Sequence, residues 1–141
     1  MTMHGRQRAV GDQPAEPSTS PLDDAALASA SVLFRGFGDV SRLAILVHLM
    51  LGEHRVRDLT EHLGLAQSTV SEHLRCLLDC GLVQVRPEGR SSVYSLAAEA
   101  EIRDMLVAAE VLLAATGNAV LVCPRREADR VAVSASQVVA T

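Results

Sequence analysis

The sequence predicts a mainly α-helical domain with a single β-hairpin. Hydrophobic residues make up 48% of the chain but aromatic residues only 2%, so its core must be built from Leu, Val, Ala and Ile, which suits helices packed on helices. Apolar residues recur at helical spacing in several separate segments. One pair of short β-prone runs flanks a turn that contains Pro and Gly. The length of 141 residues favours one domain.

The first part of the chain predicts an unstructured arm. Residues 1–21 are rich in Gly, Pro, Ser, Thr and Gln without periodicity. They lack the apolar core of a signal peptide. The longest apolar run, Leu43 to Leu51, is interrupted by His48 and is shorter than the roughly 20 residues that a membrane span needs. We therefore expect a cytoplasmic protein whose three cysteines are reduced thiols.

Two helices are predicted before residue 52. From Leu22 to Arg35, apolar residues recur at helical spacing. Asp23 and Asp24 would lie at the N-terminal end of this helix, where the helix dipole favours negative charge. Asp39 can cap a second helix that keeps the helical period until Gly52.

Two shorter helices follow, joined by a tight turn. The first runs from Val56 to Leu63 and ends at Gly64. The second runs from Gln67 to Cys80 and is followed by Gly81. Two short helices joined by a Gly-containing turn are typical of a helix-turn-helix unit.

A hairpin and a last helix complete the predicted domain. The β-prone runs 83–85 and 93–96 flank the turn residues 86–90, and a hairpin after a helix-turn-helix unit forms a wing. Residues 99–115 carry apolar side chains on one face before Gly117 ends the helix. We thus expect a winged helix-turn-helix domain over residues 22–116 and a loose tail over 117–141.

Several motifs within these elements resemble the ArsR/SmtB family of repressors. Residues 39–46, DVSRLAIL, resemble its D-x-x-R-x-x-I-L helix, and residues 67–74, QSTVSEHL, resemble its recognition helix. Residues 81–83 and 88–96 resemble its turn and wing. The resemblance spans roughly residues 25–115. It implies a homodimer, joined through the first and last helices, that binds double-stranded operator DNA.

Members of this family place their metal sites on different elements, and two of those sites are absent here. The family's C-V-C-D-L motif is matched by residues 55–59, RVRDL, which contain no cysteine. The Asp and His site on the last helix of its zinc, nickel and cobalt sensors is also missing, because no histidine follows His73.

Three cysteines remain as candidate ligands: Cys76, Cys80 and Cys123. A pair at this spacing on the recognition helix, with a third cysteine near the C-terminus, resembles the family's cadmium and lead sensors. By that resemblance all three cysteines are metal ligands, and Cd(II) or Pb(II) is the inducer.

The chemistry of thiols fits this interpretation. Residues four apart on a helix have Cβ atoms about 5–6 Å apart, so two thiolates can converge on one ion. A shell of sulfur ligands selects soft ions over Mg²⁺ and Ca²⁺, so Zn(II) and As(III) stay open as inducers besides Cd(II) and Pb(II). No organic cofactor is expected.

The alternative is that Cys76 and Cys80 are core residues, since free Cys is among the most buried residue types. The pair shares a helical stripe with Thr69 and His73 that lies beside the apolar stripe of Val70, Leu74, Leu77 and Leu78. This position favours ligands over core residues.

Six residues are predicted to contact DNA. The N-terminal half of a recognition helix meets base edges in the major groove, and the candidates there are Gln67, Ser68, Thr69, Ser71 and His73. Arg90 at the wing tip would hold phosphate, with Arg86 as a weaker candidate. Because the formal net charge is −4, local arginines must supply the attraction to DNA. The alternative for each residue is a solvated surface.

Together these features predict a metal-responsive repressor. The metal-free dimer would bind operator DNA and leave it when the three cysteines bind Cd(II) or Pb(II). Induction by As(III) or by thiol oxidation stays open. A structural zinc protein is a further alternative, and it would unfold on chelation. An enzyme is not expected, since catalytic dithiols usually occur as Cys-x-x-Cys near a βαβ unit.

Overall fold

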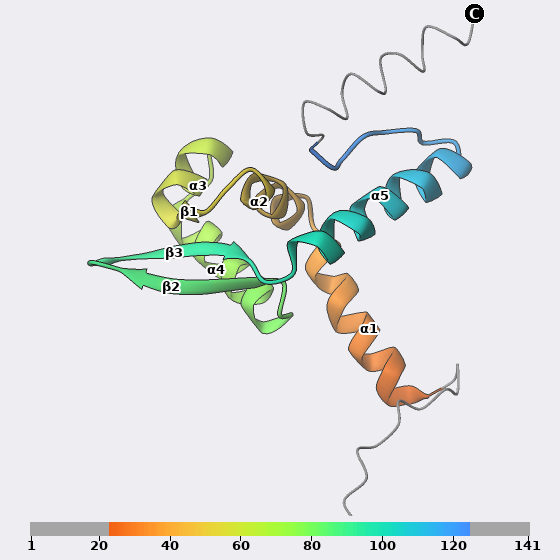
Figure 1. Cartoon of the computed structure of the whole chain (residues 1–141), viewed down its shortest axis with the longest axis horizontal. Coiled ribbons are helices and arrows are strands. Elements are labelled where there is room, and N and C mark those ends of the chain that lie inside the picture. Colours follow the sequence, from red (N-terminus) through yellow and green to blue (C-terminus); the bar gives the residue numbers. More distant parts are fainter. Residues whose placement is uncertain (1–22, 125–141) are drawn as a thin grey trace, which may run out of the picture.

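A computed structural model describes residues 23–124 of the chain. Its elements are α1 (Asp24–Phe37), α2 (Val40–Met50), β1 (His54–Arg55), α3 (Val56–Leu63), α4 (Gln67–Asp79), β2 (Val83–Glu88), β3 (Ser91–Leu96) and α5 (Glu99–Ala115). This is the predicted mainly α-helical fold with a β-hairpin wing (Figure 1). The predicted arm over residues 1–21, and the part of the predicted tail from residue 125 onward, lie outside the described residues.

Aspartates cap the first two helices. The sequence predicts Asp39 as a cap, whereas it indicates Asp23 only as a favourable charge near the start of its helix. The Asp23 carboxylate accepts a hydrogen bond of 3.0 Å from the backbone N–H of Ala25. The Asp39 carboxylate accepts one of 2.9 Å from the N–H of Arg42. Each carboxylate therefore satisfies a backbone donor that the first turn of a helix leaves without a partner.

The wing belongs to a three-stranded antiparallel sheet with the order β1-β3-β2. Its two long strands extend further than predicted, because pairing continues through Pro87 and Ser92 to Glu88 and Ser91. Proline is tolerated there because β2 is an edge strand, so no neighbour needs its missing N–H. The two-residue strand β1 was not predicted, and it pairs His54 with Tyr94.

The core lies between α2, α3 and α4. Its fully buried side chains are Ile45, Leu46, Leu59, Val70, Leu74 and Leu77. The last three belong to the predicted apolar stripe of α4, so burial of that stripe fixes which face of the helix turns outward.

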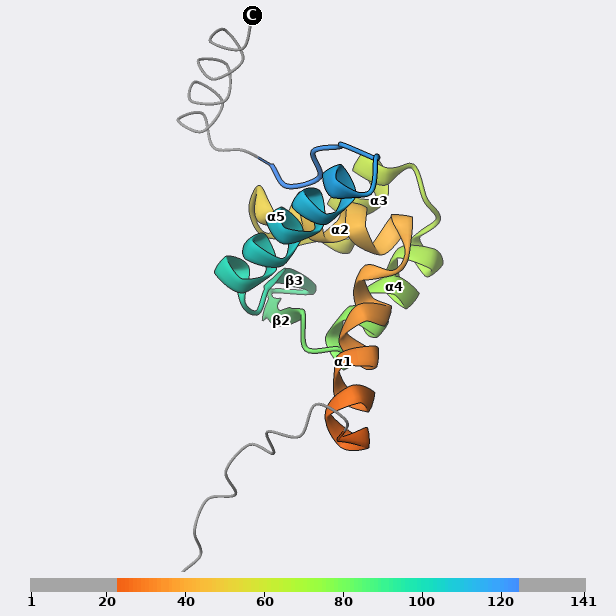
Figure 2. The ribbon, with the colours of Figure 1, turned by 90° about the vertical axis from the view of Figure 1, so that its right-hand side faces the viewer.

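Helices α1 and α5 extend to the side of the molecule opposite the wing (Figure 1), and Figure 2 views the molecule from that side. Both carry large apolar side chains that the single chain leaves uncovered, with Phe34 57% exposed and Val111 and Leu112 each 66% exposed. Such exposed apolar surface marks an interaction site. Within residues 23–124, no helix combines the length and apolar character needed to cross a bilayer.

Candidate nucleic-acid interface and thiol sites

The helix-turn-helix unit presents the start of α4 to solvent. Gly64 ends α3 with φ of 65°, a left-handed conformation that glycine adopts without steric cost. The chain then enters α4 after only two further residues. Of the predicted DNA contacts on α4, Gln67, Ser68 and Ser71 are exposed, whereas Thr69 is half-buried.

His73 faces the protein more than the other predicted contacts do. Its side chain is 19% exposed, and its Nδ1 lies 3.9 Å from Oδ1 of Asp39, the residue that caps α2. The contact of His73 with DNA stays a prediction. In the structure its ring lies beside the start of α2.

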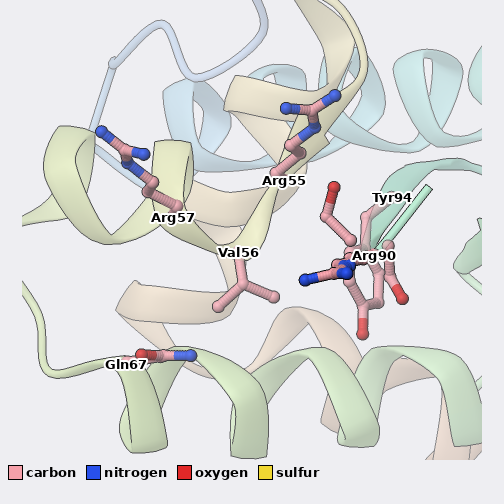
Figure 3. Close-up of a pocket in the computed structure, with 8 residues that line it drawn as sticks. Arg55, Val56, Arg57, Gln67, Arg90 and Tyr94 are labelled. Carbon is pink, nitrogen blue, oxygen red and sulfur yellow. The ribbon is translucent and has the colours of Figure 1, made fainter. Parts of the chain in front are cut away.

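A groove separates the wing from the helix-turn-helix unit (Figure 3). It has a volume of about 440 Å³, and its lining residues are Arg55, Val56, Arg57, Gln67, Arg90, Ser91, Ser92 and Tyr94. Arg90 extends from the wing toward Val56 and the start of α4. Arg55, Arg57 and Arg90 thus line one groove beside the exposed start of α4. The guanidinium groups of Arg55 and Arg57 point away from it and pair with Glu88 and Glu61, whereas Arg90 is directed into it. A guanidinium group in this position suits contact with phosphate.

Sequence reasoning found two of these residues, Gln67 and Arg90, and missed Arg55, Arg57 and Tyr94. A signal was present, because Arg55 and Arg57 flank Val56 at the predicted start of a helix. Two arginines at the start of a short helix beside a helix-turn-helix unit are a local positive charge of the kind that attracts phosphate.

The other wing arginine, Arg86, is engaged within the protein. Its guanidinium pairs with Glu53 at 2.8 Å and with Glu88 at 3.0 Å, and Arg55 also pairs with Glu88 at 3.1 Å. Hydrogen bonds from Arg86 and Arg55 lower the pKa of Glu88. Arg90, in contrast, has no hydrogen bond or ion pair with any residue between 23 and 124. Arg90 is therefore the freer of the two predicted phosphate contacts.

The thiol pair lies where the end of α4 meets α1. Cys76 and Cys80 are both half-buried, and the Cys80 thiol donates to the carbonyl oxygen of Val32 over 3.4 Å. Helix α1 comes this close because residue 36 is glycine. A Cβ atom there would lie 3.5 Å from the Cys80 sulfur and only 2.7 Å from Cδ1 of Leu82.

Burial, and then the neighbouring Cys76 thiol, raise the pKa of Cys80, while the charges of Arg42 and Arg35 act in the opposite direction. Their spacing of four residues on α4 predicts that the two thiols lie close together. Thiols release their protons when they bind a metal ion. The pair fits a soft ion, whose preferred ligand is thiolate sulfur.

Cys123 does not meet this pair in the single chain. It is 5% exposed and belongs to the hydrophobic core. Its backbone N–H and that of Val122 both donate to Oε1 of Glu110 in α5, each over 2.7 Å. Within residues 23–124, no three side chains of the metal-ligating types are grouped to hold one ion. The three-cysteine site thus stays a prediction, and its third member is held elsewhere.

Known proteins resemble this chain both in sequence and in structure. Residues 39–85 match the family model described as bacterial regulatory protein, arsR family. The probable mercury resistance operon repressor of Streptomyces lividans is 36% identical over 92 residues, which cover 65% of this chain and 73% of that protein. The transcriptional regulator CmtR of Mycobacterium bovis is 44% identical over 79 residues, covering 56% of this chain and 64% of CmtR.

Among solved structures, a homodimeric winged helix-turn-helix DNA-binding domain from Mycobacterium bovis is similar, with a TM-score of 0.59 and 28% identity. The match covers 69% of this chain and 90% of that domain. The predicted winged helix-turn-helix fold is therefore confirmed.

Proposed function

The chain belongs to the arsR family of bacterial regulatory proteins, and we propose that it is a homodimeric repressor that leaves operator DNA when soft metal ions bind its cysteines. The groove between the wing and α4 carries the DNA-binding part of this proposal, because it places Arg55, Arg57 and Arg90 beside Gln67. Phosphate contacts from such arginines position a recognition helix, and base contacts from its exposed face give specificity.

Dimerisation is supported by the apolar faces of α1 and α5. Phe34, Val111 and Leu112 are exposed in the single chain, and the similar domain from M. bovis is homodimeric. A two-fold dimer of this fold would present two α4 helices to successive turns of the major groove, roughly 34–36 Å apart. We expect a palindromic operator for this reason.

The cysteines supply the proposed sensor. Cys76 and Cys80 would hold the ion, with Cys123 as the third ligand. Their thiolate sulfurs would donate electron pairs to a soft cation. Because Cys80 lies at the contact between α4 and α1, a change at this pair acts on the recognition helix and on a helix of the proposed dimer interface together. This position supports coupling between the sensor and DNA binding.

Cd(II) and Pb(II) remain the proposed inducers, because the three cysteines resemble the ligands of the family's cadmium and lead sensors. The relative from S. lividans is described as a mercury resistance repressor, and Hg(II) is also a thiol-seeking ion, so it belongs in the test. Arsenite or oxidation of the thiols is the second candidate signal, because the half-buried pair could respond to either.

The proposal is tested by fluorescence anisotropy of the reduced protein on DNA from upstream of its own gene. Titration with Cd²⁺, Pb²⁺, Hg²⁺, arsenite or peroxide should separate the signals, and coupling of the usual size would weaken DNA binding by about 5–150-fold. The Cys123→Ser variant is expected to bind DNA normally and to respond less to metal. Tighter DNA binding on addition of metal would overturn the proposal of a metal-released repressor.

A further inference from the structure

The segment that follows α5 turns back and runs along that helix (Figures 1 and 2). It is attached by Glu110, whose side chain is only 6% exposed. One oxygen of this carboxylate accepts hydrogen bonds from the N–H groups of Val122 and Cys123, each over 2.7 Å. Bonds from N–H to a carboxylate are charge-assisted and stronger than those between neutral groups. Glu110 thus binds the backbone of the residue that carries the third thiol.

A second contact lies seven residues earlier on the same face of α5. Nη1 of Arg103 donates to the carbonyl oxygen of Pro124 over 2.8 Å and lies 3.6 Å from the Cys123 sulfur. Seven residues are almost two helical turns, so Arg103 and Glu110 form one strip along α5. The tail is therefore held on both sides of Cys123, by a cation and by an anion.

Cys80 lies near a different side of α5. Cys80, together with Ile102 and Met105 of α5, lines an apolar hollow of about 380 Å³. At about 100° per residue, Met105 lies roughly 160° around the helix from Arg103. The docked tail therefore places Cys123 on another face of α5 from the one near Cys80.

We propose that Glu110 is a positioning residue that stores Cys123 on α5, so that a three-cysteine site can form only after the tail leaves this position. The inference rests on the proposed function, which makes Cys123 a ligand. By holding the tail, Glu110 and Arg103 would set the metal concentration at which the protein responds. Docking competes with metal binding, because docked Cys123 is only 5% exposed, so an ion held by Cys76 and Cys80 of the same chain or of the partner subunit cannot reach its sulfur.

The first test measures the docking itself, without metal. In a Cys76→Ser/Cys80→Ser background, the full-length chain has Cys123 as its one thiol, and its rate of reaction with a thiol reagent such as DTNB reports undocking. Glu110→Gln and Arg103→Met should each raise this rate, by about ten-fold or more if a charge-assisted bond is lost. Glu101→Gln is the matched control, an exposed carboxylate on the same helix, and it should leave the rate unchanged. Equal rates in all four proteins would overturn the proposal.

The second test measures Cd²⁺ affinity, by competition with a chelator, in chains that retain all three cysteines. Glu110→Gln and Arg103→Met should tighten binding, and the gain should disappear when Cys123→Ser is added. If the two variants react faster with the thiol reagent but do not bind Cd²⁺ more tightly, docking does not control metal binding, and the proposal is overturned. If Cys123→Ser alone leaves Cd²⁺ affinity unchanged, the three-cysteine site fails, whereas the reaction rates still report the docking.

Discussion

The Cys80 thiol, at the end of α4, donates a hydrogen bond to the carbonyl oxygen of Val32 in α1 over 3.4 Å. This contact joins the proposed recognition helix to a helix whose apolar side chains are uncovered in the single chain. We therefore expect a change at Cys80 to affect both the proposed recognition helix and the proposed dimer interface.

This relationship predicts how a conservative change at Cys80 behaves. Cys80→Ser retains a hydrogen-bond donor for Val32 but removes a soft ligand, so the metal-free protein should bind the operator with its normal affinity. The change in operator affinity on adding Cd²⁺, about 5–150-fold when intact, should nearly vanish. Anisotropy titrations with and without metal check this prediction. A variant that still leaves the DNA fully with Cd²⁺ would exclude Cys80 as a ligand.

The core under α4 gives a prediction about stability. Leu77 is completely buried, so Leu77→Ala should lower the free energy of unfolding by about 2–5 kcal/mol, because it removes apolar contacts and leaves a cavity. Leu51→Ala, at a position that is 68% exposed, should change it by no more than about 0.5 kcal/mol. Urea denaturation at one fixed protein concentration compares them, since the stability of a dimer depends on concentration. Equal losses in the two variants would contradict the packing described.

The sequence predicts all five helices of residues 23–124, because apolar residues that are buried on one face recur every three to four positions, as in the stripe of Val70, Leu74 and Leu77. Strand β1 has only two residues, too few for an alternating pattern to be visible. Its position depends instead on pairing with Tyr94, forty residues later.

The spacing of Cys76 and Cys80 predicts their proximity because a single helix sets it. The position of Cys123 depends on a hydrogen bond from its backbone N–H to the Glu110 carboxylate. The spacing of residues along the sequence does not predict such a bond. One signal was available, because Glu110 continues the buried series of Ile102 and Leu106 at intervals of four. An acidic residue in such a series indicates a buried partner.

The two wing arginines should differ in their contribution to DNA binding. Arg90 lines the groove and has no partner among the described side chains, so Arg90→Ala should lower the slope of log K against log salt by about one unit, the loss of one phosphate contact. Arg86 is already paired with Glu53 and Glu88, so Arg86→Ala should change the slope less. Anisotropy titrations over a range of salt concentrations measure both slopes. A larger change for Arg86 would reverse the assignment.

The last prediction concerns acid sensitivity and a cluster of three imidazoles from α2, β1 and α3. The ring of His62 lies 5.3 Å from those of His48 and His54, and the latter two are 6.2 Å apart, between ring centroids. Burial, followed by the charges that His62 and His54 acquire on protonation, lowers the pKa of His48 below its ordinary value of 6.5. The folded protein therefore holds the proton at His48 less tightly than the unfolded chain does.

Because the unfolded state binds more protons in this range, His48 should reduce stability as the pH falls from 6.5 toward its lowered pKa, and have no such effect above 6.5. His48→Gln removes the titrating group, so the stability of this variant should fall less over the same interval. His62→Gln should give a smaller effect, because it removes one neighbouring charge but leaves His48 buried. Urea denaturation at a series of pH values compares the three proteins. The prediction is contradicted if His48→Gln and the wild type lose stability in parallel below pH 6.5.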